Sequence, residues 1–159
     1  MSRPQLARLA QPFPSRLIHS NPSGGGDYVS HAVVTQKMLA VLDSYQFEVV
    51  EVLRGHVPGI KPNPNGKSDR ARNGTPDLDN AVVGVLCRLS AVVDGHRYEL
   101  TEVGDCEQPH NWNTDGARLK DAMSDAFKRC AMRLGVGLHL WSQKDGFFLH
   151  DQLTKEDDK

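Results

Sequence analysis

Residues 121–141 have the sequence DAMSDAFKRCAMRLGVGLHLW, which predicts a helix that packs on a sheet and ends at a glycine-rich turn. The apolar stripe at helical spacing comprises Leu119, Ala122, Met123, Ala126, Phe127, Cys130 and Leu134. Because several of these side chains are small, the helix can lie close to a sheet. Thr114 or Asp115 can cap its first turn, and Gly135 suits the left-handed position after its last turn.

The segment before this helix predicts an antiparallel β-hairpin. Residues 80–105, NAVVGVLCRLSAVVDGHRYELTEVGD, contain two strand-forming runs on either side of Asp94-Gly95. This pair suits a type I′ turn, in which both central residues have positive φ. The residues expected on the buried face of the first run are Val83, Val85, Cys87, Leu89, Ala91 and Val93.

Two further elements are predicted nearer the N-terminus. A helix is expected from about Ser30 to Leu42, because apolar residues recur there at helical spacing. In residues 45–55, YQFEVVEVLRG, β-branched side chains alternate with other residues, and this pattern predicts a strand. The order helix, strand, loop, hairpin, helix predicts an α+β domain: an antiparallel β-sheet packed by a long C-terminal helix, with an N-terminal helix.

Three segments break these patterns. Residues 1–27 contain several prolines and the joint NPSGGGD, so we expect a flexible, loosely structured N-terminal arm before a domain of residues 28–148. Residues 55–79 form a long loop that is poor in apolar side chains and carries Lys61, Lys67, Arg70 and Arg72. Residues 149–159 are expected to form an acidic tail, and the last fifteen residues hold five acids and two lysines.

The composition predicts a single globular domain inside the cell. The chain has 159 residues, of which 25% are charged and 38% hydrophobic, and its net charge is −1. The longest apolar run, 81–87, is too short to cross a membrane, and no apolar leader follows the first arginines. The three cysteines form an odd set that favours reduced thiols in a cytoplasmic compartment.

The long helix carries a group of basic residues with two interpretations. On a helical wheel, Arg118, Arg129 and Arg133 fall within about 60° of one another on one flank of the apolar stripe, while Lys128 points away from it. The first interpretation is a solvated face with ion pairs to Asp121 and Asp125. The second is a track for successive phosphates of a nucleic acid. Three or four contacts per chain are too few for tight binding, so the second interpretation also requires many copies side by side.

The motifs together resemble the Rad52/Rad22 superfamily of single-strand annealing proteins. In residues 121–138, Asp125, Lys128, Arg129 and Gly135 are in register with the superfamily's signature helix. The hairpin stretch VVGVLCRLSAVVDG resembles its Val-Gly-Val strand ending in Asp-Gly, and EVGD resembles the glycine after the next strand. Upstream, GGGDYV, a helix and SYQF follow the superfamily's order, so the resemblance covers about residues 24–141.

The resemblance implies a β-β-β-α core that assembles into a homo-oligomeric ring or helical filament. Single-stranded DNA would lie in a basic outer groove, and complementary strands would be annealed in homologous recombination and DNA repair. The resemblance implies no bond-breaking reaction, so the protein is expected not to be an enzyme and to need no ATP or other cofactor. The short chain without a further C-terminal region indicates a phage or bacterial version, acting in the bacterial cytoplasm beside an exonuclease or a recombinase.

The resemblance and the helical wheel together select the candidate contacts. The expected DNA-binding residues are Lys128, Arg129, Arg133, Arg118, Tyr45 and Lys37. Lys128 and Arg129 match the signature helix, and Tyr45 would sit near the groove. Lys37, like His31, is only the nearest candidate for a basic residue of the first helix. A further basic residue expected one turn beyond Arg129 is replaced by Met132. The 55–79 loop is also longer than the turn usual in the superfamily.

Three alternatives stay open from the residues alone: a metal-dependent nuclease, a simple single-stranded DNA-binding protein and a purely structural phage protein. A metal-dependent nuclease would need clustered carboxylates with a nearby lysine, which Pro76-Asp77, Glu99 and Glu102 do not supply. Cys106 and His110 could supply two zinc ligands but lack a second pair. A simple single-stranded DNA-binding protein would use aromatic side chains to stack on bases, and aromatics are only 6% of the chain.

Overall fold

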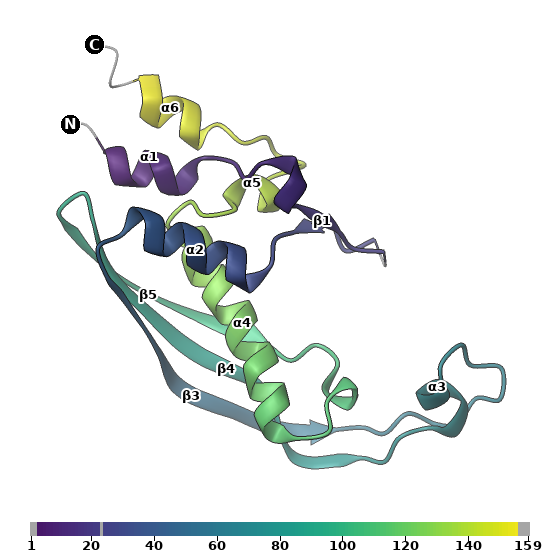
Figure 1. Cartoon of the computed structure of the whole chain (residues 1–159). Coiled ribbons are helices and arrows are strands. Elements are labelled where there is room, and N and C mark those ends of the chain that lie inside the picture. Colours follow the sequence, from purple (N-terminus) through teal and green to yellow (C-terminus); the bar gives the residue numbers. More distant parts are fainter. Residues whose placement is uncertain (1–2, 23, 156–159) are drawn as a thin grey trace. The chain divides into compact units, whose positions relative to one another are not determined.

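The computed structural model describes residues 3–22 and 24–155 and shows an α+β fold (Figure 1). The helices are α1 (Pro4–Ala10), α2 (His31–Val41), α3 (Asp69–Asn73), α4 (Asp115–Arg133), α5 (Leu138–Trp141) and α6 (Leu149–Lys155), with 3₁₀ turns at Ser15–Leu17 and Pro109–Asn111. The strands are β1 (His19–Ser20), β2 (Asp27–Tyr28), β3 (Tyr45–Val57), β4 (Leu78–Val93) and β5 (His96–Asp105). These bounds confirm the predicted first helix, strand, hairpin and long helix.

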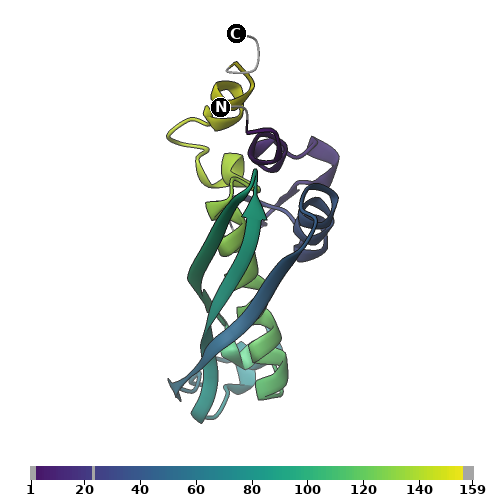
Figure 2. The ribbon, with the colours of Figure 1, turned by 90° about the vertical axis from the view of Figure 1, so that its left-hand side faces the viewer.

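The strands form two antiparallel sheets. β1 pairs with β2, with His19 opposite Tyr28, and the larger sheet has the order β3-β4-β5 (Figure 2). Asp94 and Gly95 have φ values of 50° and 77°, as the predicted type I′ turn between β4 and β5 requires. The predicted fold class is therefore confirmed.

The chain divides into two compact units. The first unit comprises Met1–Glu48, Arg88–Glu102 and Phe127–Lys159, and the second comprises Val49–Cys87 and Val103–Ala126. The strands of the larger sheet and α4 contribute residues to both units.

The core of the first unit is built where the end of α4, α1, α2 and the hairpin meet. Its most deeply buried large side chains are Leu9, Met38, Leu89, Val93, Cys130 and Leu134, each at most 1% exposed. Alternation along β4 places Leu89, Ala91 and Val93 in this core, as the sequence predicts. α1 contacts both α2 and α6 (Figure 1).

The expectation of a loosely structured arm is wrong for α1. Pro4 lies in the first turn of α1, where backbone N–H groups have no partner within the helix, so its missing N–H costs no hydrogen bond. Leu9 and Ala10 are fully buried. The carboxylate of Asp94 accepts hydrogen bonds from the backbone N–H groups of Gln5 (2.8 Å) and Leu6 (3.0 Å). The hairpin turn thus caps α1 from a distant part of the sequence, which the proline-rich local pattern could not indicate.

The proposed acidic tail begins within α6. Leu149–Lys155 form this helix, while Glu156, Asp157 and Asp158 lie outside the described residues. The division of the chain into an arm, a domain of residues 28–148 and a tail stays a prediction.

The second unit packs the start of α4 against the sheet through glycine. A Cβ added to Gly104 would lie 2.0 Å from the carbonyl oxygen of Ala122 and 2.6 Å from the nitrogen of Ala126. Because no side chain fits there, backbone meets backbone at this contact. Ala122 and Ala126 are fully buried, as expected from the small residues of the stripe.

The long loop of the second unit is folded. β3 continues to Val57, and α3 interrupts the loop before β4 begins. The N–H of Thr75 donates to the carbonyl of Ile60 at 2.9 Å, and the N–H of Asn63 donates to the carbonyl of Ala71 at 2.8 Å. The loop is therefore shorter than the predicted 55–79 and has an internal hydrogen-bonded frame.

Candidate nucleic-acid interface

The last two turns of α4 present basic side chains in the first unit. Lys128 and Arg129 are half-buried, and the Arg133 side chain is 59% exposed. Within the described residues, no hydrogen bond or ion pair is found for the Lys128 ammonium. The Arg133 Nε donates to Glu102 Oε1 at 2.6 Å, so part of its charge is neutralised by β5. Lys128 and Arg129, which match the signature helix, thus remain the main candidates for phosphate contacts, although Arg129 has a further interaction within the described residues.

A tight turn after α4 fixes the end of this basic segment. Gly135 has a φ of 90°, and the N–H of Val136 donates to the carbonyl of Ala131 at 3.1 Å. This confirms Gly135 as the left-handed residue that ends the helix. A Cβ at Gly135 would lie 3.1 Å from the Cβ of Ala10, so α1 packs directly against the turn.

The turn brings an aromatic ring to the basic segment. The guanidinium carbon of Arg129 lies 5.1 Å from the ring centroid of Trp141, at the end of α5. The contact is within cation–π range. Trp141 as a whole residue is 50% exposed. Trp141 is absent from the contacts predicted from the sequence. The glycines that reverse the chain after α4 were the only available signal for this contact.

Tyr45 lies beside the same end of α4. Its ring centroid is 6.0 Å from that of Phe127, the residue before Lys128. Tyr45 also lines a shallow hollow of about 190 Å³ whose walls include Ser90 and Arg97. The structure therefore brings Tyr45 into the same unit as Lys128 and Arg129, and its ring is partly core and partly surface.

The ammonium of Lys37 contacts other residues of the first unit. Its ammonium donates to the carbonyl of Gln11 and lies 4.5 Å from the ring centroid of Phe13. Burial lowers the pKa of Lys37 to about 8. These contacts hold α2 to the segment after α1, so Lys37 has a structural use that the sequence did not indicate. The neighbouring candidate, His31, places its ring 5.0 Å from Phe127.

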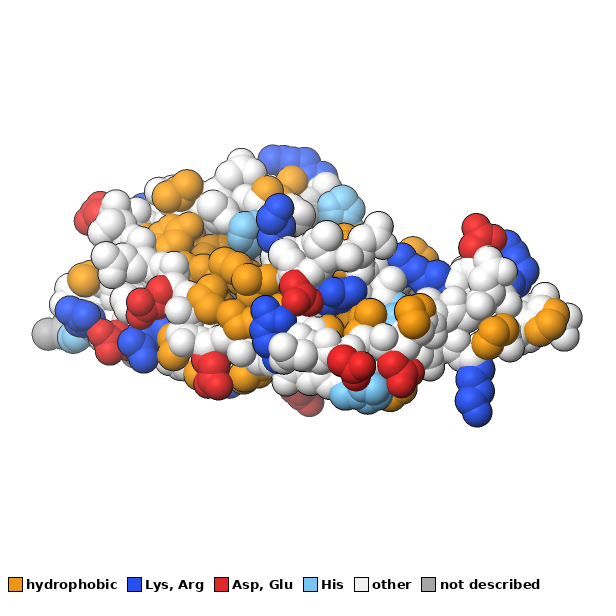
Figure 3. Space-filling model, turned by 90° about the horizontal axis from the view of Figure 1, so that it is seen from below, with side chains coloured by type: hydrophobic (Ala, Val, Ile, Leu, Met, Phe, Trp, Pro, Cys, Tyr) orange, Lys and Arg blue, Asp and Glu red, His pale blue; other side chains and the backbone are white. Residues whose placement is uncertain are grey.

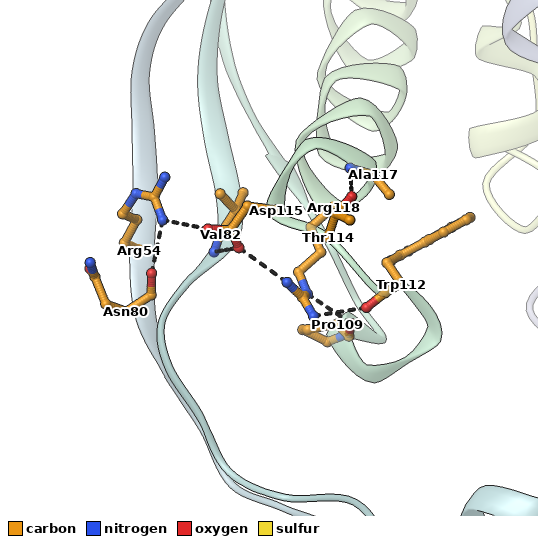
Figure 4. A network of polar contacts seen from close by, with 9 residues as sticks. All are labelled: Arg54, Asn80, Val82, Pro109, Trp112, Thr114, Asp115, Ala117 and Arg118. Carbon is orange, nitrogen blue, oxygen red and sulfur yellow. Dashed lines mark hydrogen bonds and ion pairs between the residues drawn. The ribbon is translucent and has the colours of Figure 1, made fainter.

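Arg118, in the second unit, is buried and internally bonded (Figure 4). Only 7% of the residue is exposed. Its Nε donates to the carbonyl of Pro109 at 2.9 Å, one terminal nitrogen donates to the carbonyl of Trp112 at 2.8 Å, and the other pairs with Asp115 at 3.1 Å. The guanidinium fork therefore fastens the 3₁₀ turn before α4 to the first turn of the helix.

Asp115 joins this network to the sheet (Figure 4). One carboxylate oxygen accepts from Arg54 of β3 at 2.8 Å, and the other accepts from the N–H of Val82 at 3.1 Å. The bond from Arg54, with smaller contributions from Val82 and Arg118, lowers the pKa of Asp115. The N–H of Ala117 donates to Thr114 Oγ1 at 3.1 Å, which confirms Thr114 as a cap of α4.

The basic residues of the folded loop fall into two pairs. Arg70 donates to the side chain of Asn111, and Arg72 pairs with Asp69 and donates to the carbonyl of Gly66 at 3.2 Å. Lys61 and Lys67 make no hydrogen bond or ion pair within the described residues. The arginines thus stabilise the loop, and the lysines remain available to an anionic partner.

The charge on the surface is mixed. Figure 3 shows basic side chains interspersed with acidic ones over the visible face, around an exposed apolar area.

Among residues 3–22 and 24–155, no group of three metal-ligating side chains lies close enough to hold a metal ion. Burial is the main cause that raises the pKa of Cys106 to about 11. In the same residues, no helix has the length and apolar character needed to cross a membrane.

The comparison with protein families identifies the class of this chain. The model of the Rad52/22 family double-strand break repair proteins matches residues 4–159, nearly the whole chain. No curated protein and no solved structure matched in the other two comparisons.

The chain therefore belongs to the Rad52/22 family, and the family predicted from the resemblance is confirmed. Family membership supports a role in DNA recombination and double-strand break repair.

Proposed function

We propose that this protein binds single-stranded DNA and anneals complementary strands in homologous recombination and repair. The observation that carries the proposal is the end of α4, where Lys128 and Arg129 lie on a helix held between the hairpin and α1. A rigid helix fixes the positions of these cations, so successive phosphates can be held at a regular spacing. The match to a double-strand break repair family supports a DNA partner.

The proposal includes assembly of many copies into a ring or filament. Each chain offers Lys128 and Arg129, with Arg133 as a partly neutralised third cation. Each phosphate contact on a single strand contributes about 0.7 to the slope of log K against log salt, so one chain alone would bind weakly. Repetition of the contacts along one strand would raise the overall affinity without any new kind of contact.

The proposed activity needs no bond-breaking chemistry. Ordered strands with their bases accessible find complementary partners faster than freely coiled ones, because part of the ordering entropy is already lost. We propose that neither nucleotide nor metal takes part. We further propose that the protein works in the bacterial cytoplasm beside an exonuclease or a recombinase.

An annealing assay tests the proposal. Two complementary oligonucleotides are mixed in buffer with chelator and without nucleotide, and duplex formation is followed by fluorescence energy transfer. The wild-type chain should accelerate annealing, and the double variant K128A/R129A should not. The matched control is K120A, which removes an exposed lysine on the other flank of α4 and should anneal like the wild type.

Three outcomes would contradict parts of the proposal. Tight binding of single strands without accelerated annealing would identify a simple single-stranded DNA-binding protein. DNA cleavage on addition of Mg²⁺ or Mn²⁺ would identify a metal-dependent nuclease. A monomeric mass by light scattering at micromolar concentration, with and without oligonucleotide, would remove the ring or filament.

A further inference from the structure

Trp141 has a position that packing alone does not explain. Tryptophan is on average one of the more buried residue types, yet half of Trp141 is exposed. Its ring lies under the guanidinium of Arg129, at 5.1 Å from centroid to guanidinium carbon. The ring is thus a surface feature in contact with one of the two strongest candidates for phosphate binding.

The turn between α4 and Trp141 fixes the position of this ring. Gly135 and Gly137 have φ values of 90° and 70°, which allow two left-handed residues within three positions. The N–H and the hydroxyl of Ser142 both bond to the carbonyl of Leu138, each at 3.0 Å, and so close the short turn of α5. Trp141 therefore sits on a closed turn anchored to the end of α4.

The contact places a cation directly beside an aromatic ring. Arg129 also has a further interaction within the described residues, so a phosphate would join the existing contacts of its guanidinium. A nucleotide carries its base one sugar away from its phosphate. Two side chains in contact, one cationic and one aromatic, can therefore bind the two parts of a single nucleotide.

We infer that Trp141 is a DNA-contacting residue, on which one nucleobase stacks beside the phosphate held by Arg129. This inference rests on the proposed single-strand binding and deepens it, because it adds a stacking contact to the phosphate contacts. The indole lies against the Arg129 guanidinium and offers its exposed surface to the base. Every copy in an assembly would thereby hold one base at a fixed point, and this would set the register of the bound strand.

The fluorescence of the tryptophans gives a direct test. The chain contains two tryptophans, so in the variant W112F all tryptophan emission comes from Trp141. Trp112 belongs to the second unit, and its carbonyl, which accepts from Arg118, is kept in the variant. Titration of W112F with oligo-deoxythymidine should quench the emission of Trp141. The reciprocal variant W141F should show no comparable quenching from Trp112.

Binding measurements separate stacking from a purely structural role. W141L should bind oligo-deoxythymidine about tenfold more weakly than the wild type, with an unchanged slope of log K against log salt, because stacking releases no counterions. W141F keeps an aromatic ring and should restore most of the affinity. If Trp141 only positioned Arg129, W141L would lower the slope as R129A does, and this result would overturn the stacking contact.

The two proposals fail in different ways. If the wild-type chain does not bind oligo-deoxythymidine at all, the proposed function fails and the inference with it. If the wild type binds but the Trp141 emission of W112F is unchanged at saturation, the inference alone fails. The fluorescence titration keeps Trp141 intact, so it decides the matter even if W141L does not fold.

Discussion

The two ends of α4 carry arginines on the same flank of the helix and use them differently. Near the start, Arg118 is 7% exposed and directs its guanidinium at two carbonyls and a carboxylate. Near the end, Arg129 is half-buried beside a half-exposed indole, and Arg133 is exposed. Helical periodicity places the three side chains together on a wheel. The tertiary surroundings decide that the first is a structural residue, that Arg129 lies against Trp141 and that Arg133 is exposed beside Glu102.

The difference also separates folding from function. Substitutions that break the packing or the hydrogen bonds of the first part of α4 should lower the stability of the protein. Substitutions of the basic residues at its end should lower DNA binding with little change in stability. Substitutions at four sites test this separation.

Gly104→Ala should give the largest effect, on stability. The new Cβ would lie 2.0 Å from the carbonyl oxygen of Ala122, so the start of α4 must move away from β5. We expect a loss of about 3 kcal/mol in the free energy of unfolding, measured by urea denaturation. Gly116→Ala is the matched control, because its Cβ has open space and the nearest atom is Thr114 Oγ1 at 3.9 Å. This control should stabilise the protein by about 0.5 kcal/mol. Equal stabilities for the two variants would contradict the close packing.

Arg118→Ala should lower the free energy of unfolding by about 2 kcal/mol, because the carbonyls of Pro109 and Trp112 lose their charged donor. Arg118→Lys should recover little of this loss, since an ammonium cannot reproduce the three directions of the fork. Both variants can be compared by chemical denaturation. If Arg118→Ala were as stable as the wild type, the network in Figure 4 would have no energetic role.

Lys128→Ala together with Arg129→Ala should weaken the binding of a single-stranded oligonucleotide by about tenfold, since two phosphate contacts are removed. The unfolding midpoint should change little, because the helix keeps good helix formers at both positions. Fluorescence anisotropy measures the affinity and circular dichroism the midpoint. A variant with a lower unfolding midpoint but normal affinity would instead show that Lys128 and Arg129 stabilise the fold and do not contact DNA.

Glu102→Gln should have the smallest effect, and in the opposite direction. It removes the carboxylate that pairs with Arg133 at 2.6 Å and frees that guanidinium for phosphate. Binding should tighten by roughly twofold at low salt and less at high salt. Arg133→Ala in the same background should cancel the gain. Weaker binding by Glu102→Gln would indicate that the ion pair orients Arg133 for DNA.

The fold was largely predictable from local patterns. Local patterns predict the bounds of three elements to within a few residues: the spacing in α4, the alternation in β4 and the Asp94-Gly95 turn. Each of these elements depends on one periodicity or one turn type. The missed helix α1 depends on the carboxylate of Asp94, about ninety residues away, and no local pattern contains that bond.

The candidate site was predictable only in part. The basic segment Lys128-Arg129 follows from the signature helix. The hydrogen bonds of Lys37 to Gln11 and of Arg118 to the turn before α4 depend on which loop packs over each side chain. The contact of Trp141 with Arg129 depends on the path of the chain after Gly135. Charge on a helical wheel therefore identified candidates, and burial separated them.

The salt dependence of single-strand binding gives the sharpest test of the phosphate contacts at the end of α4. The slope of log K against log salt is measured for the wild type, for K128A/R129A and for R118A, both of which remove positive charge. We expect K128A/R129A to lower the magnitude of the slope by about 1.4, which is two contacts on a single strand, and R118A to leave it unchanged. A slope that falls for R118A and stays constant for K128A/R129A would contradict the proposed contacts.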